Sequence, residues 1–94
     1  IPPDNTTDAV AMLDADLWIL GAVGRVYDRY ATLIRQEYIH VPEEAYRTGR
    51  PAVLERFLQR EKIYLGAWPG VTKREARARE NLQREIAMLR NPVD

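Results

Sequence analysis

The sequence predicts an all-α fold. Apolar residues recur every three or four positions in four segments, Gly and Pro separate these segments, and no run alternates as a half-buried strand would. The 94 residues suffice for one small domain or part of a larger one, and no internal repeat or low-complexity tract divides them. We therefore expect residues 1–94 to form a single helical unit of four helices, with a loop at 61–71.

Composition excludes several classes of function. The chain has 14 basic and 14 acidic residues, so bulk positive charge cannot drive binding to a nucleic-acid duplex or a membrane surface. It contains no cysteine, which removes disulfides, zinc fingers and thiol catalysis, and its single histidine cannot build a His-rich metal site. Charges interrupt the longest apolar stretch, residues 9–26, so no membrane span is expected. With no signal peptide either, we expect a cytoplasmic protein.

The first helix is expected from about Asn5 to Leu20. Asn5 or Thr6 can cap its free amides, and Gly21 supplies a C-terminal stop. A helix with apolar residues on more than half its circumference needs more protein around it than three further helices supply. We therefore expect something else to pack on residues 5–20. Two adjacent stripes make up this surface: Val10, Leu13, Leu17 and Leu20, then Met12, Ala15 and Ile19.

The second and third helices follow the same periodicity. The second is expected from about Gly24 to Tyr38, and the third begins at Pro42, where proline at the first position costs no hydrogen bond. Gly49 and Pro51 fall inside the third helix. Because Pro51 removes an amide and crowds the preceding turn, we expect a kink or a break near residues 48–50.

The last helix is expected to begin with a capping box, in which Thr72 caps the helix and Glu75 reaches back. It runs to about Arg90, before Asn91-Pro92. Two i,i+4 ion pairs are expected along it, Glu75–Arg79 and Glu80–Arg84. Its apolar seam consists of Ala78, Leu82, Ile86 and Leu89.

Two carboxylates, Asp14 and Asp16, lie in the most hydrophobic stretch of the chain. Residues two apart on a helix point about 200° apart, so at most one of them faces a given site. A carboxylate on a buried face is costly unless it is paired or binds a metal. The structural alternative places Asp14 at the solvent edge and pairs Asp16 with an arginine.

Five short motifs in order resemble the C-terminal half of the bacterial metal-dependent HD-superfamily phosphohydrolases, over residues 9–90. They are residues 14–21 (DADLWILG), residues 34–38 (IRQEY), Gly49-Arg50 followed by Leu54 and Phe57-Leu58, then Ile63-Tyr64, and residues 78–82 (ARENL). The resemblance implies the four-helix C-terminal portion of an HD-domain bundle. It also implies a divalent metal held by a histidine, a His-Asp doublet and a distant aspartate, and hydrolysis of a phosphate ester or nucleotide.

By this resemblance Asp16 is the distant metal-binding aspartate, and Asp14 is the second choice. The other ligands have no counterpart, because His40 is followed by Val41 and lies after the aspartate. One carboxylate cannot hold a catalytic ion, so the chain alone is not expected to be active. The metal would bind only with ligands from outside this chain. These would come from the N-terminal half of the same protein or from a second chain that packs on residues 5–20, and the sequence is then a fragment.

Arg35 and Arg50 are candidates for binding a substrate phosphate, with an ion pair as the alternative for each. Tyr38 and Tyr64 fit either a pocket or the core, and Trp68 fits an anchor for its loop. The rival function, from a different class, is a non-catalytic helical interaction module whose apolar first helix docks into a partner.

Overall fold

The computed structural model describes residues 13–91, and this part of the chain is helical with no strand. Residues 13–16 are helical and are followed by the 3₁₀ helix η1 (Trp18–Gly21). Three α-helices come next: α2 (Gly24–Glu37), α3 (Glu43–Leu58) and α4 (Val71–Arg90). The all-α prediction is confirmed, whereas the predicted start of the first helix at residues 5–12 lies outside the described residues. None of the described helices has the length and apolar character needed to cross a membrane.

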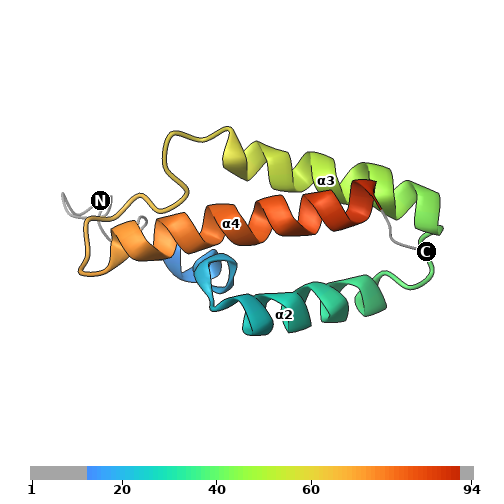
Figure 1. Cartoon of the computed structure of the whole chain (residues 1–94), viewed down its shortest axis with the longest axis horizontal. Coiled ribbons are helices and arrows are strands. Elements are labelled where there is room, and N and C mark those ends of the chain that lie inside the picture. Colours follow the sequence, from blue (N-terminus) through green and yellow to red (C-terminus); the bar gives the residue numbers. More distant parts are fainter. Residues whose placement is uncertain (1–12, 92–94) are drawn as a thin grey trace, which may run out of the picture.

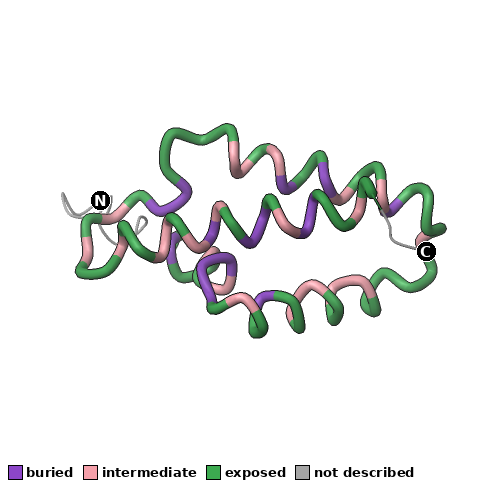
Figure 2. The backbone as a smooth tube through the Cα atoms, viewed as in Figure 1, coloured by how far each residue is buried: buried purple, intermediate pink, exposed green. Residues whose placement is uncertain are grey.

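Helix α4 is the centre of the arrangement. Figure 1 shows α3 and α2 on opposite sides of α4, and each packs against α4 rather than against the other. The element η1 also packs on α4, near its beginning. Figure 2 places the buried positions along α4 and at the points where the other elements meet it. The core consists of Leu20, Tyr27, Leu54, Ile63, Tyr64, Ala78, Leu82 and Ile86, which confirms Ala78, Leu82 and Ile86 as the seam of the last helix.

The first helix ends differently from the prediction. Its α-helical part stops at Asp16, and η1 tightens the chain until Gly21. Polar side chains of α4 bind the carbonyl groups that this change leaves free. The Asn81 amide donates to Leu20 and Ala22 at 2.8 Å each, and Arg77 donates to Gly21 at 2.8 Å. The helix end is therefore fixed by hydrogen bonds from α4.

Helix α3 runs through Pro51 without a break. Of the predicted kink or break, the break is therefore wrong and the kink stays a prediction. Pro51 is buried, and so are Tyr46 one turn before it and Leu54 one turn after it. Packing of both halves on α4 offsets the hydrogen bond that Pro51 cannot make.

The predicted capping box at Thr72 is also wrong. Gly70, with φ of 83°, precedes α4, and no side chain caps the helix. Glu75 instead accepts the backbone amides of Ile63 and Tyr64 at 3.0 and 3.1 Å, so its carboxylate holds a loop rather than its own helix. The Glu75–Arg79 pair is confirmed at 2.8 Å.

The second predicted pair on α4 is replaced by a contact between helices. Arg84 pairs with Asp28 of α2 at 2.7 Å instead of with Glu80. Because the partner lies on α2, the contact links two helices that the sequence pattern treats separately.

Substitutions at two glycines, Gly21 and Gly49, test how closely η1 packs on α4. A Cβ at Gly21 would lie 2.3 Å from the Arg74 Cγ atom and 2.8 Å from its carbonyl oxygen, whereas a Cβ at Gly49 would meet nothing within 4 Å. We expect Gly21→Ala to reduce the free energy of unfolding by about 1–3 kcal/mol, because backbone must move. Gly49→Ala, inside α3, should raise it by about 0.5–1 kcal/mol.

Thermal melting of both variants checks this, since about 1 kcal/mol shifts the melting temperature of such a domain by about 4–8 °C. Equal melting temperatures for Gly21→Ala and the wild type would mean that η1 does not approach α4 this closely.

Candidate functional site

Asp14 is buried and hydrogen bonded to the loop between α3 and α4. Its Oδ1 accepts the Leu65 amide at 2.8 Å, and its Oδ2 accepts the Gly66 amide at 2.8 Å and the Trp68 indole N–H at 2.9 Å. Burial alone would raise the pKa of Asp14, but the hydrogen bonds from Trp68, Leu65 and Gly66 together lower it below its ordinary value. Both carboxylate oxygens are thus engaged within the protein.

Asp16 is exposed and forms no ion pair with any residue of the described range. The structural alternative from the sequence is therefore reversed: Asp14, not Asp16, is buried, and its partners are N–H groups rather than an arginine. The sequence could not reveal this, because the N–H groups that bind Asp14 belong to a loop 51 to 54 positions away.

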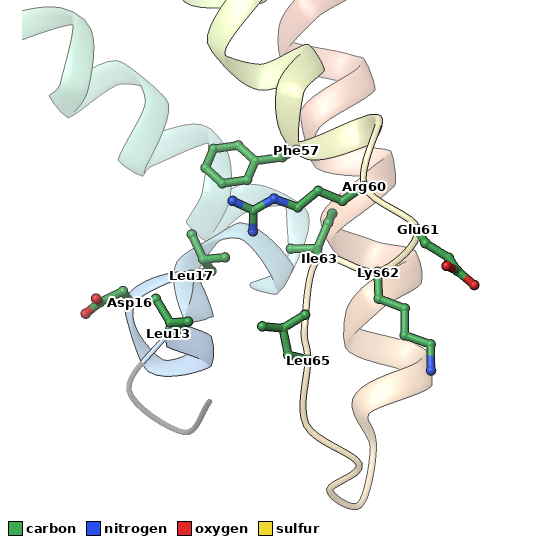
Figure 3. Close-up of a pocket in the computed structure, with 9 residues that line it drawn as sticks. All are labelled: Leu13, Asp16, Leu17, Phe57, Arg60, Glu61, Lys62, Ile63 and Leu65. Atoms are coloured by element: carbon green, nitrogen blue, oxygen red, sulfur yellow. The ribbon is translucent and has the colours of Figure 1, made fainter. Parts of the chain in front are cut away.

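An open groove of ≈ 840 Å³ lies between the helical turn at residues 13–17 and the segment that follows α3. Figure 3 shows the Arg60 side chain reaching from the end of α3 into this groove, between Phe57, Leu17 and Ile63. Asp16 lies at the opposite edge and points away from the groove. The lining residues are Leu13, Asp16, Leu17, Phe57, Arg60, Glu61, Lys62, Ile63 and Leu65.

The segment that carries Arg60 is held in place by α4. The Arg79 guanidinium donates to the carbonyl of Leu58 at 3.0 Å and to that of Arg60 at 2.8 Å. Glu75 holds Arg79 in turn. The Arg60 guanidinium lies over the Phe57 ring, 4.9 Å from its centre, and makes no ion pair among residues 13–91. Arg60 is not among the residues that the sequence pattern indicates, because nothing in that pattern places it opposite the first helix.

The two arginines expected to bind phosphate lie away from this groove. Arg50 pairs with Glu85 of α4 at 2.9 Å in the interior, where Glu85 also accepts the Tyr27 hydroxyl. Burial lowers the pKa of Arg50, but the hydrogen bond and charge of Glu85 raise it above its ordinary value. The interhelical ion pair foreseen as the alternative is the arrangement found for Arg50.

Arg35 donates to the carbonyls of Tyr38 and Val41 at 2.7 and 3.1 Å and covers the Tyr46 ring. It therefore closes the end of α2 and bridges to α3. Among the described residues Arg35 forms no ion pair, which was the alternative to phosphate binding.

A second cavity of ≈ 310 Å³ lies beside Arg35, between α2, α3 and the end of α4. Tyr46 and Glu85 are among the residues that line it. The Tyr46 hydroxyl is buried without a hydrogen-bond partner in the described structure, and burial raises its pKa. No feature of the sequence pointed to this cavity.

The aromatic residues behave as structural anchors. Trp68 binds Asp14 and packs against Trp18, with ring centres 5.1 Å apart, so it does anchor its loop. Tyr64 is buried and donates its hydroxyl to the Leu17 carbonyl at 2.7 Å, whereas Tyr38 is half exposed. His40 lies exposed in the turn after α2.

Within residues 13–91 there is no cluster of three or more His, Cys, Asp and Glu side chains that could hold a metal ion. Of the two carboxylates in the motif at residues 14–21, only that of Asp16 is exposed. The described residues around Asp16 do not supply further ligands for a metal ion.

No protein-family model, curated protein or solved structure matches this chain.

The two aspartates should respond differently to loss of charge. Asp14→Asn places an amide group against N–H donors, and we expect the free energy of unfolding to fall by about 1–3 kcal/mol. Asp16→Asn should change it by less than about 0.5 kcal/mol, because Asp16 is exposed and unpaired. Urea unfolding of both variants measures the difference. A larger loss for Asp16→Asn than for Asp14→Asn would contradict the hydrogen bonding described for Asp14.

Stability should also fall in acid. Burial raises the pKa of Glu75, but hydrogen bonds from Ile63, Tyr64 and Arg79 lower it overall, so Asp14 and Glu75 both have lowered pKa values in the folded protein. Their contribution is fully present above the unfolded-state pKa of about 4 and is lost as pH falls through the lowered values.

We therefore expect the free energy of unfolding to decrease below about pH 5 and to decrease less steeply in Asp14→Asn. Urea unfolding at a series of pH values tests this, and equal slopes for variant and wild type would exclude Asp14 as a source of the dependence.

Proposed function

We propose that this chain is the C-terminal part of an HD-type, divalent-metal-dependent phosphohydrolase acting on a phosphate ester or nucleotide, and that it is inactive alone. The single observation that carries the proposal is that the two aspartates of the motif at residues 14–21 have different surroundings. Asp14 is saturated by N–H donors, whereas Asp16 remains exposed beside an apolar groove. Asp16 is thus the carboxylate of this motif that is open to an external ligand.

The chemistry requires more than Asp16. A catalytic divalent ion needs several ligands and an open position for water, and its charge is what makes that water nucleophilic. A histidine and a His-Asp doublet from an upstream part of the same protein, or from a second chain, would complete the set. Asp16 would then bind and orient the ion from the edge of the groove.

The exposed apolar surface around the groove supports such a partner. Leu13 and Leu65 both line the groove and are 51% and 53% exposed. A small domain that leaves large apolar side chains exposed around one groove gains stability when a second element covers them.

The same apolar surface favours a second candidate, a non-catalytic helical module that docks into another protein. The two functions differ in what they need upstream. A phosphohydrolase needs a histidine and a His-Asp doublet in the preceding coding sequence, whereas the interaction module needs neither.

The decisive experiment uses a protein that includes the preceding coding sequence. We expect a divalent ion such as Mn²⁺ to raise its melting temperature, because the ion binds only the folded state. Asp16→Asn should abolish both this rise and metal-dependent phosphate-ester hydrolysis while preserving the helical circular-dichroism spectrum. Glu61→Gln, which removes another carboxylate that lines the same groove, is the matched control and should keep both.

An unchanged metal response in Asp16→Asn would exclude Asp16 as a ligand. If the wild type shows no metal response at all and no hydrolysis, the interaction module replaces the phosphohydrolase.

A further inference from the structure

The groove beside Asp16 combines an apolar floor with one inward-pointing cation. Leu17, Phe57 and Ile63 surround the Arg60 guanidinium, while Glu61 and Lys62 point away from the groove (Figure 3). The four charged lining residues, Asp16, Arg60, Glu61 and Lys62, have formal charges that sum to zero, but the one charge that reaches into the groove is positive. A ligand that matches this surface has an apolar body and an anionic group.

We propose that this groove binds the organic part of a phosphate ester, with the Arg60 guanidinium on its anionic phosphate. The choice of phosphate over other anions rests on the proposed function. The groove specifies two features that the proposed function does not. The substrate carries an apolar or aromatic group, and its phosphate contacts Arg60 rather than Arg35 or Arg50.

Arg60 has the free donors that this role needs. A guanidinium presents its N–H groups in a planar fork that fits two phosphate oxygens at once. Arg50 donates its N–H groups to Glu85, and Arg35 donates its N–H groups to two backbone carbonyls. Among residues 13–91, the Arg60 guanidinium forms no ion pair or hydrogen bond, and it lies over the Phe57 ring.

The backbone beneath Arg60 is already fixed before any ligand arrives. Arg79 binds the carbonyls of Leu58, Arg60 and Glu61, and Glu75 holds both Arg79 and the amides of residues 63 and 64. Less backbone freedom is therefore lost on binding, which favours affinity.

The test is a titration of the whole chain with 1-naphthyl phosphate, followed by amide chemical shifts in a buffer without phosphate. We expect saturable shifts at Ile63 and Leu65 and at the Arg60 side chain, with a dissociation constant on the order of 1 mM for this open groove. Inorganic phosphate and 1-naphthol, which each carry half of the ligand's chemistry, should bind at least tenfold more weakly.

Matched variants separate the two halves of the site. Arg60→Gln should weaken 1-naphthyl phosphate at least tenfold, because it removes the charge-assisted hydrogen bonds. Arg56→Gln, an exposed arginine one turn earlier that does not line the groove, should not. Leu65→Ser should weaken binding of the ligand by roughly threefold to tenfold through the apolar contact. Met88→Ser, at an apolar side chain that is even more exposed but lies outside this groove, should leave the affinity unchanged.

Three results would overturn the proposal: no saturable binding up to about ten times the expected dissociation constant, unchanged affinity in Arg60→Gln, or equal affinity for 1-naphthol. Equal affinity for 1-naphthoate would overturn the assignment of phosphate as the anion. The titration needs no metal, so it fails independently of the metal-dependent melting of the longer protein. Binding without a metal response would overturn the phosphohydrolase and leave the organic-anion groove standing.

Discussion

Two carboxylates that are far apart in the sequence, Asp14 and Glu75, hold the loop between α3 and α4. Glu75 accepts the amides of Ile63 and Tyr64, and Asp14 accepts the next two, those of Leu65 and Gly66. A loop without regular structure that enters a core must find partners for its amides, because an unpaired buried N–H group costs about 1–3 kcal/mol. These hydrogen bonds allow Ile63 and Tyr64 to be buried, and the core around α4 depends on both side chains.

Helix α4 satisfies polar groups on both of its sides. Asn81 and Arg77 donate to carbonyls of residues 20–22, and Arg79 donates to carbonyls at the end of α3. Figure 1 shows why one helix can do both, since α4 lies between η1 and α3. Its charged residues are therefore largely connections to neighbouring elements rather than a solvated face. The apolar seam supplies the contact area, and these hydrogen bonds fix where each neighbour ends.

The same network determines what remains for function. Asp14 and Arg50, both plausible site residues in the sequence, are held by the loop amides and by Glu85. Asp16 and Arg60 are left with exposed charges on opposite edges of one groove. In each pair, the aspartates and these two arginines, one member is bonded within the protein and the other is left exposed.

Sequence alone determined the helical fold and the buried seam of α4, because a period of 3.6 residues is a local property that any four-turn window reports. It also indicated that a carboxylate of residues 14–21 needs a partner, because a carboxylate in an apolar helix is costly to bury alone. Asp14 has such partners in the loop amides. The sequence pattern was wrong about the cap at Thr72, about a break at Pro51 and about which of Asp14 and Asp16 is buried. In each case the outcome depended on a group distant in sequence: loop amides for Glu75 and Asp14, and the surface of α4 for Pro51. Only the tertiary structure decides which partner such a side chain takes, because the side chain binds the groups that the completed fold brings within reach. The local sequence pattern carries no information about groups that are distant in sequence.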